Sequence, residues 1–163
     1  MARILVIDDD ELVRQTVKMM LEAGGHEVAL AAHGGDGLKK FRLRPYDLVV
    51  CDILMPEKEG VETVKELRQL TRTTPIIAMT GGPPIQVGAN RGGDVDYLHM
   101  AKALGATQTL RKPFIAAQLR ALVRDVSTTV RRRQPEVARL LHSSPLRTIP
   151  VAEHLRSEHA LRA

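Results

Sequence analysis

The chain has 163 residues, which suits one compact domain with a short extension, and 44% of them are apolar, enough for a hydrophobic core. The one cysteine excludes an internal disulfide and a four-cysteine zinc site, and the apolar run at residues 4–7 is too short for a signal peptide or a membrane span. The net charge of +5 is concentrated in residues 127–163, which carry +4, so the body is nearly neutral, and we expect a soluble, cytoplasmic protein.

Five short apolar segments along residues 1–112 predict β-strands. The first, third and fourth are continuously apolar and do not alternate with polar residues, which is typical of strands buried on both faces of a parallel sheet. The five segments are Arg3–Ile7, Val28–Ala32, Leu48–Cys51, Pro75–Met79 and Thr107–Leu110.

Amphipathic helical patterns follow each of these segments. The first pattern ends at Gly24-Gly25, the second stops before Pro45, and the fourth is closed by Gly105. Apolar positions in the five patterns include Leu12 to Leu21, Leu38 and Phe41, Val61 to Leu67, Leu98 to Leu104, and Ile115 to Val126. This fivefold βα order predicts a doubly wound α/β sandwich, in which ligands bind at the carboxyl ends of the strands.

Two stretches interrupt this order. Residues 81–93 are rich in Gly and Pro and predict a long loop, with the next helix starting near Asp94. Residues 127–163 contain three prolines and seven arginines, and they are too few for a second domain with its own core. We therefore expect one domain over residues 1–126 and a basic C-terminal extension, partly helical or disordered, over residues 127–163.

Polar residues stand where the predicted strands end. The first strand ends in Asp8-Asp9-Asp10, the third in Asp52, the fourth in Thr80 and the fifth in Lys112-Pro113. Carboxylates packed together raise one another's pKa values unless a cation neutralises them, and a few carboxylates with open positions favour Mg²⁺. With a hydroxyl and an ammonium added, the set has the groups needed to place a phosphoryl group on a carboxylate.

Four segments together resemble the receiver domains of two-component response regulators. They are Ile4–Asp10, Asp47–Pro56 followed by Gly60, Pro75–Thr80, and Lys112–Phe114, and the resemblance covers about residues 2–126. It implies a flavodoxin-like (βα)5 fold with a parallel five-stranded sheet in the order 2-1-3-4-5. It also implies a phosphoprotein that accepts a phosphoryl group from a histidine kinase or a histidine phosphotransfer protein, and that is not otherwise an enzyme.

The resemblance assigns a role to each site residue. Asp52 would be the phosphoacceptor, with Thr80 and Lys112 contacting the phosphoryl group. Mg²⁺ would be bound by Asp9, Asp52 and the backbone carbonyl of Leu54, with Asp8 acting through water. The Lys112-Pro113 peptide bond would be cis.

The sequence departs from the family at two places. The 32-residue spacing from Thr80 to Lys112 is longer than usual, and the extra length falls in residues 81–93. Thr109 stands where many receivers have an aromatic residue that moves on activation. The usual route from the phosphate to the output surface is therefore in question.

Two features of the sequence have alternative interpretations. Asp8-x-Asp10 after an apolar strand also fits haloacid-dehalogenase-like phosphatases, but the second acidic pair that this family needs is missing. The basic tail could bind nucleic acid, although 37 residues without a helix-turn-helix pattern or aromatics make this output unlikely. We expect Asp10 to cap a helix and Cys51 to be an inert core residue. We expect the output to be a contact with another protein or phosphate transfer within a relay, with no membrane partner.

Overall fold

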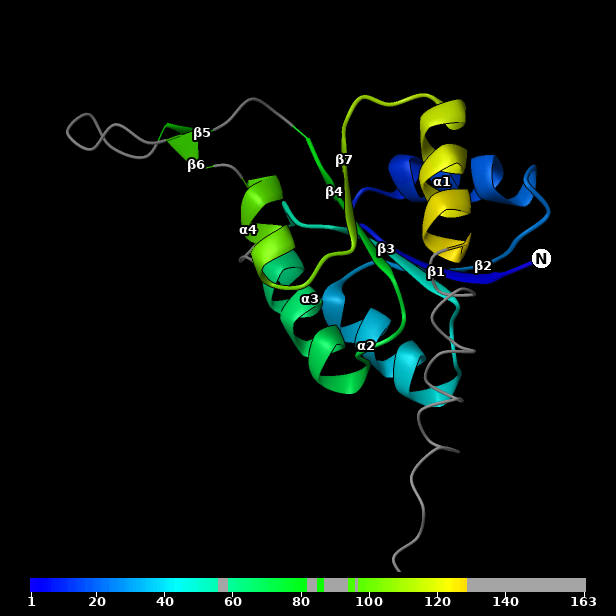
Figure 1. The fold of residues 1–163 in the computed structure, drawn as a ribbon, viewed down its shortest axis with the longest axis horizontal. Helices are drawn as coiled ribbons and strands as arrows, with labels where there is room; N and C mark the ends of the chain where they lie inside the picture. Colours follow the sequence, from blue (N-terminus) through cyan, green and yellow to red (C-terminus); the bar gives the residue numbers. More distant parts are fainter. Residues whose placement is uncertain (56–58, 82–84, 87–93, 96, 129–163) are drawn as a thin grey trace, which may run out of the picture. The chain divides into compact units, whose positions relative to one another are not determined.

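The computed structural model describes residues 1–55, 59–81, 85–86, 94–95 and 97–128. Among these residues the strands are β1 (Arg3–Ile7), β2 (Glu27–Ala31), β3 (Leu48–Asp52), β4 (Ile76–Thr80), β5 (Ile85–Gln86), β6 (Asp94–Val95) and β7 (Gln108–Arg111). The helices are α1 (Glu11–Glu22), α2 (Gly34–Leu43), α3 (Glu59–Leu70) and α4 (Tyr97–Ala103), and residues 116–128 are also helical. Figure 1 shows their arrangement.

The main sheet has five parallel strands in the order β2-β1-β3-β4-β7. Because β7 is the fifth of these strands along the chain, the predicted order 2-1-3-4-5 is confirmed. The register pairs Ile7 with Cys51 and Cys51 with Ala78, so the carboxyl ends of the three central strands meet at one edge of the sheet.

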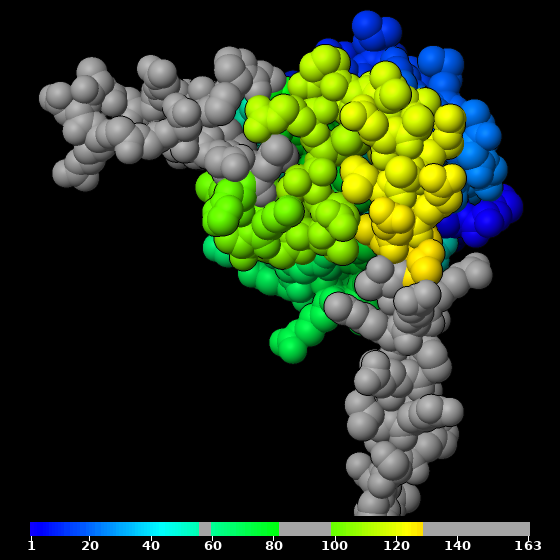
Figure 2. Space-filling view, turned by 45° about the horizontal axis from the view of Figure 1, so that its top comes forward, coloured from blue at the N-terminus to red at the C-terminus, as the bar shows by residue number. Residues whose placement is uncertain are grey.

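The three central strands β1, β3 and β4 are buried on both faces, as their continuous apolar character predicts, whereas the edge strands β2 and β7 are only partly buried. Alternate residues of each strand belong to two separate core clusters: Leu5 and Val49 to one, Ile4 and Val50 to the other. Helices α2, α3 and α4 cover the first face, and α1 covers the second together with the C-terminal helix over residues 116–128 (Figure 1). That yellow helix lies beside the blue N-terminal segment that contains α1 (Figure 2).

The structure corrects the prediction for residues 81–93 and for the helix after them. Ile85–Gln86 forms β5, which pairs antiparallel with Asp94–Val95 in β6, so a short hairpin replaces part of the expected loop. Asp94 therefore lies in a strand, and α4 begins at Tyr97. Each strand has only two residues, too few for a periodic pattern to be visible in the sequence. Residues 82–84 and 87–93 lie outside the described residues, as does the predicted extension beyond residue 128.

Arg68 of α3 joins three segments at the amino-terminal edge of the sheet. Its Nε donates to the carbonyl of Gly105 at 2.6 Å, and its Nη1 donates to the carbonyl of Thr74 at 2.6 Å. Its Nη2 donates to the Thr107 hydroxyl at 3.1 Å. Gly105 has φ 108°, and a Cβ there would come within 2.7 Å of Arg68 Cγ, so both the backbone conformation and the packing require glycine.

Candidate functional site

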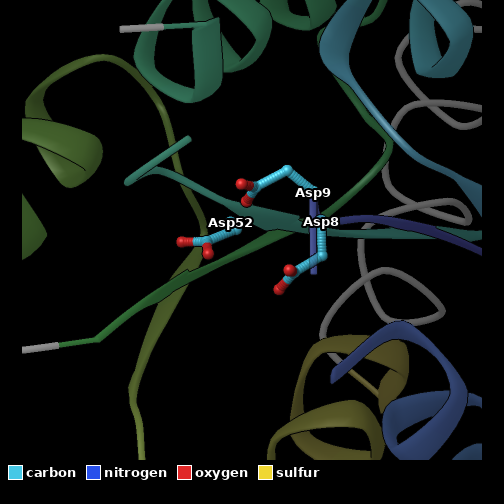
Figure 3. Close-up of side chains that lie close together, drawn as sticks. All are labelled: Asp8, Asp9 and Asp52. Atoms are coloured by element: carbon cyan, nitrogen blue, oxygen red, sulfur yellow. The ribbon is translucent and has the colours of Figure 1, made fainter. Parts of the chain in front are cut away.

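Three carboxylates converge at the carboxyl-terminal edge of the sheet. Asp8 and Asp9 follow β1, and Asp52 is the last residue of the neighbouring strand β3 (Figure 3). One ligand oxygen from each lies within 4.8 Å of those from the other two. Asp8 and Asp52 are 0% and 5% exposed, whereas Asp9 is exposed. The cluster therefore could bind a metal ion that enters from the solvent side of Asp9.

Lys112 connects two of these carboxylates. It follows β7, and its Nζ lies 2.7 Å from Asp8 Oδ2 and 2.7 Å from Asp52 Oδ2. Burial is the largest single effect and lowers the pKa of Lys112, but the hydrogen bonds to Asp52 and Asp8 and the negative charges of these carboxylates together outweigh it and raise the pKa overall. The lysine thus stays charged and supplies one positive charge to the two buried carboxylates of the cluster.

Burial has the opposite consequence for Asp8. It raises the pKa of this carboxyl, and this effect outweighs the hydrogen bond from Lys112, which lowers the pKa. The charge of Asp52 raises the pKa of Asp8 further. Lys112 alone therefore compensates the ionised cluster only partly, which leaves room for a second cation.

The turn from β1 to α1 fixes the acidic residues. Asp10 is the N-cap of α1, and its Oδ1 accepts from the amides of Leu12 at 2.8 Å and Val13 at 3.2 Å, as predicted for a capping residue. The amide of Asp10 donates to Asp8 Oδ1 at 2.9 Å. The third aspartate of the run thus caps the helix and orients Asp8, while its own carboxylate stays outside the cluster.

The backbone after Asp52 is also held closely. The amide of Leu54 donates to Asp52 Oδ1 at 3.0 Å. A Cβ at Gly60, in the first turn of α3, would overlap the carbonyl of Asp52 and the Cα of Ile53. Gly60 therefore permits α3 to pack directly against the segment that carries Asp52. The role of the Leu54 carbonyl as a metal ligand stays a prediction.

Thr80 and Thr109 lie on the neighbouring strands β4 and β7. Thr80 is the last residue of β4 and is 4% exposed, and its carbonyl accepts from the amide of Lys112 at 2.6 Å. Its hydroxyl lies 3.5 Å from the carbonyl of Gly81. Thr109 is half-buried and pairs with Ala78. The Lys112-Pro113 peptide bond is cis, as predicted.

Arg14 is a further residue of the site that the sequence did not indicate, and its Nη1 donates to the carbonyls of Asp8 at 2.6 Å and Asp9 at 2.9 Å. A contact with backbone carbonyls leaves no pattern in the sequence, because every residue has a carbonyl. Cys51 is fully buried in β3, and burial raises the pKa of its thiol well above the ordinary value. This agrees with the prediction of an inert core residue.

Known proteins with similar sequences carry the same type of domain. The family model of the response regulator receiver domain matches residues 4–124. The chain is 36% identical over 128 residues to the transcriptional regulatory protein CpxR of Klebsiella pneumoniae, covering 76% of this chain and 50% of that protein. It is 39% identical over 97 residues to ZraR of Salmonella typhimurium, covering 58% of this chain and 22% of that protein. The chain thus spans half or less of the curated relatives it matches.

Solved structures with the same fold include chemotaxis and receiver proteins. A CheY-like receiver domain protein from Methanospirillum hungatei has a TM-score of 0.70 at 26% identity, with coverage of 80% of this chain and 97% of that chain. The chemotaxis protein CheY4 of Vibrio cholerae has a TM-score of 0.65 at 31% identity, with coverage of 77% and 98%.

These similarities place the chain among signalling proteins and outside the classical enzyme families, so the phosphatase alternative is set aside. Within the described ranges, no helix is long and apolar enough to cross a bilayer. The family match covers about three quarters of the sequence and contains every residue of the aspartate cluster, together with Lys112. The chain belongs to the response regulator receiver domain family.

Proposed function

We propose that Asp52 accepts a phosphoryl group from a phosphohistidine of a histidine kinase or a histidine phosphotransfer protein, in a reaction that requires Mg²⁺. One observation supports this most strongly: three carboxylates lie within 4.8 Å of one another, and Lys112 Nζ lies 2.7 Å from two of them. A nucleophilic carboxylate, a cation site and a fixed ammonium are thus close together.

The donor set fits Mg²⁺. Every candidate ligand is an oxygen, and three carboxylates leave coordination positions for water and for phosphate. Asp9 and Asp52 would bind the ion directly with the carbonyl of Leu54, and Asp8 would act through water. The bound ion would neutralise oxygens of the transferred phosphoryl group.

Each protein group would have a separate task in the transfer. An oxygen of Asp52 attacks phosphorus, a P–O bond forms, and the P–N bond of the phosphohistidine breaks with the imidazole as leaving group. Lys112 then moves from the carboxylate of Asp52 to a phosphoryl oxygen, while the Thr80 hydroxyl donates to another. By this account the chain assists its own phosphorylation and does not turn over a substrate.

The partners follow from the position of the site. Leu12 and Ile115 are 75% and 64% exposed, and each stands three residues along the chain from a site residue, Asp9 and Lys112 respectively. They would offer apolar contacts to a phosphodonor protein. Residues 1–126 would carry the chemistry, and residues 127–163 would be an extension.

The curated relatives are named transcriptional regulators, but the shared stretch is the receiver region, so for this stretch we favour output through a protein contact.

Labelling with a small acyl phosphate tests the assignment. With acetyl phosphate and Mg²⁺, intact-mass spectrometry should detect one added phosphoryl group, which chelation of Mg²⁺ prevents. Asp52→Asn should not be labelled. Asp10→Asn is a matched control, because asparagine also caps helices and Asp10 holds no phosphate, so it should be labelled like the wild type. Equal labelling of Asp52→Asn and the wild type would refute the assignment.

A further inference from the structure

Arg14 makes two hydrogen bonds that the proposed chemistry does not use. Its Nη1 donates to the backbone carbonyls of Asp8 and Asp9, at 2.6 and 2.9 Å. These are the two residues whose carboxylates form the cluster with Asp52. The guanidinium therefore contacts the backbone that presents the cluster, at the point where β1 passes into α1.

The choice of partners is unusual for an arginine beside three carboxylates. A guanidinium in such a place commonly forms a bidentate ion pair. In the part of the chain that the structure describes, however, no carboxylate lies within ion-pair distance of Arg14, and Asp8 and Asp52 pair with Lys112 instead. Arg14 therefore holds the backbone and leaves the carboxylates available to a cation.

The two carbonyl contacts also orient a side chain. A trans peptide unit is planar, with its C=O and N–H on opposite sides. Since Arg14 holds the carbonyl of Asp9, the N–H of Asp10 in the same unit is turned the other way, where it donates to Asp8 Oδ1 at 2.9 Å. Asp8 Oδ2 accepts from Lys112. Both oxygens of the buried Asp8 are thus fixed, one of them through a peptide unit that Arg14 holds.

We propose that Arg14 is a positioning residue for the cation site, which fixes the 8–9 and 9–10 peptide units so that the carboxylates of Asp8 and Asp9 face Asp52 before the ion binds. This rests on the proposed function, because it takes these aspartates as the Mg²⁺ site. Groups that orient metal ligands without touching the metal commonly change metal affinity by about 10–100-fold when they are removed.

The charge of Arg14 and its hydrogen bonds predict opposite effects on Mg²⁺. A positive charge near the site repels the ion, so loss of the charge alone would tighten binding. Loss of the hydrogen bonds frees the two peptide units, and the ion then has to order its own ligands, which weakens binding. The sign of the change therefore separates a positioning residue from a bystander charge.

The experiment uses the full chain and two Mg²⁺-dependent readouts: affinity by calorimetric titration, and the rate of labelling by acetyl phosphate as a function of Mg²⁺ concentration. Arg14→Gln should weaken Mg²⁺ binding about tenfold and raise the half-saturating Mg²⁺ concentration by the same factor. Its maximal rate at saturating Mg²⁺ should stay within about twofold of the wild type, because Arg14 does not contact the phosphoryl group.

Two further variants separate the hydrogen bonds from the charge. Arg14→Lys keeps the charge and can donate to a carbonyl, so it should recover part of the lost affinity. Arg72→Gln removes one positive charge from the turn before β4, at the opposite edge of the sheet, and should bind Mg²⁺ like the wild type.

Unchanged or tighter Mg²⁺ binding in a cooperatively folding Arg14→Gln variant would overturn the positioning role. A lower maximal rate at unchanged affinity would also overturn it, because Arg14 would then act in the transfer step. Failure of the proposed function looks different: Asp52→Asn would then be labelled like the wild type, whatever Arg14→Gln does.

Discussion

Two partly buried cations hold opposite edges of the same sheet, and their partners differ in kind. Lys112, at the carboxyl-terminal edge, is bound by the carboxylates of Asp8 and Asp52. Arg68, at the amino-terminal edge, is bound by backbone carbonyls and the Thr107 hydroxyl. Burial lowers the pKa of both groups, but only Lys112 has carboxylates that more than reverse the effect.

Because of this difference, the ligands at the carboxyl-terminal edge can bind a second cation, whereas those at the amino-terminal edge serve Arg68 alone. The carboxylates around Lys112 can be shared with a second cation, so the same atoms can serve two states of the protein. The carbonyls around Arg68 are neutral and have no competing ligand, so the contact only joins α3 to the turns at Thr74 and Gly105. Substitutions at the two edges should therefore respond differently to Mg²⁺.

The largest expected effect on stability belongs to Arg68. Arg68→Ala leaves two close backbone carbonyls without their charged donor and should lower the free energy of unfolding by about 3 kcal/mol, measured by urea denaturation. At a temperature where the variant remains folded, acetyl phosphate should label it at the wild-type rate. Arg72→Ala, an exposed neighbour, should change stability by less than about 0.5 kcal/mol. A loss under about 1 kcal/mol for Arg68→Ala would show that the contact is not structural.

Lys112→Ala should be destabilising in a way that Mg²⁺ reverses. Without Mg²⁺ the variant leaves Asp8 and Asp52 buried without their cation, at a cost of about 2 kcal/mol, which is less than for a fully buried pair because the Lys112 side chain is 18% exposed. Saturating Mg²⁺ should restore most of this loss, and the affinity for Mg²⁺ should be no weaker than in the wild type, because Lys112 competes for the same oxygens. Arg68→Ala is the control, since Mg²⁺ should not rescue it. A Mg²⁺ affinity loss as large as that of Asp9→Ala would contradict this division of tasks.

Asp8→Asn should stabilise the Mg²⁺-free protein at neutral pH by on the order of 1 kcal/mol, because it removes a buried charge while keeping the shape of the side chain. The pKa of Asp8 is raised in the folded state above the unfolded value of 3.8, so the folded protein binds the proton more tightly. The wild type therefore loses stability as pH rises from about 3.8 through the raised pKa.

The advantage of Asp8→Asn should accordingly be largest at neutral pH and small below pH 3.8, where Asp8 is protonated in both states. Thermal unfolding at several pH values in the presence of a chelator measures it. An asparagine variant less stable than the wild type at pH 7 would mean that the ion pair with Lys112 outweighs the burial of Asp8.

The smallest effect on stability and on labelling is expected when the residues after Thr129 are removed. A chain ending at Thr129 retains the helix over residues 116–128, whose Leu119, Val123 and Val126 complete the second core cluster. It should be labelled at the same rate as the full chain and should unfold cooperatively within about 2 °C of it. Loss of cooperative unfolding would show that residues beyond 129 belong to the domain.

The strand ends and the acidic site were predictable because a parallel sheet brings the carboxyl ends of its strands together. Asp8 and Asp52 stand at the carboxyl ends of apolar strands, and Lys112 stands directly after β7, so each is visible in the sequence, and the parallel register brings them into contact. Asp10 was predictable as a cap because a short acidic side chain preceded a helical pattern.

Arg14 and Arg68 were not predictable in the same way. Apart from the Thr107 hydroxyl, their partners are backbone carbonyls, which every residue has, so the sequence carries no mark of the contact. The partner of Arg68 at Gly105 is also 37 residues away, and only the fold brings them together. The β5–β6 hairpin escaped prediction because its strands are too short to show a period.

The central claim is that the phosphoryl group resides on Asp52, and chemical trapping tests it most directly. Borohydride reduces an aspartyl phosphate to homoserine, so the labelled full chain is reduced, digested and sequenced by mass spectrometry. The account predicts homoserine at position 52 only when acetyl phosphate and Mg²⁺ were both present. Homoserine at position 8 or 9 instead, or a phosphate retained on a side chain other than Asp52, would contradict it.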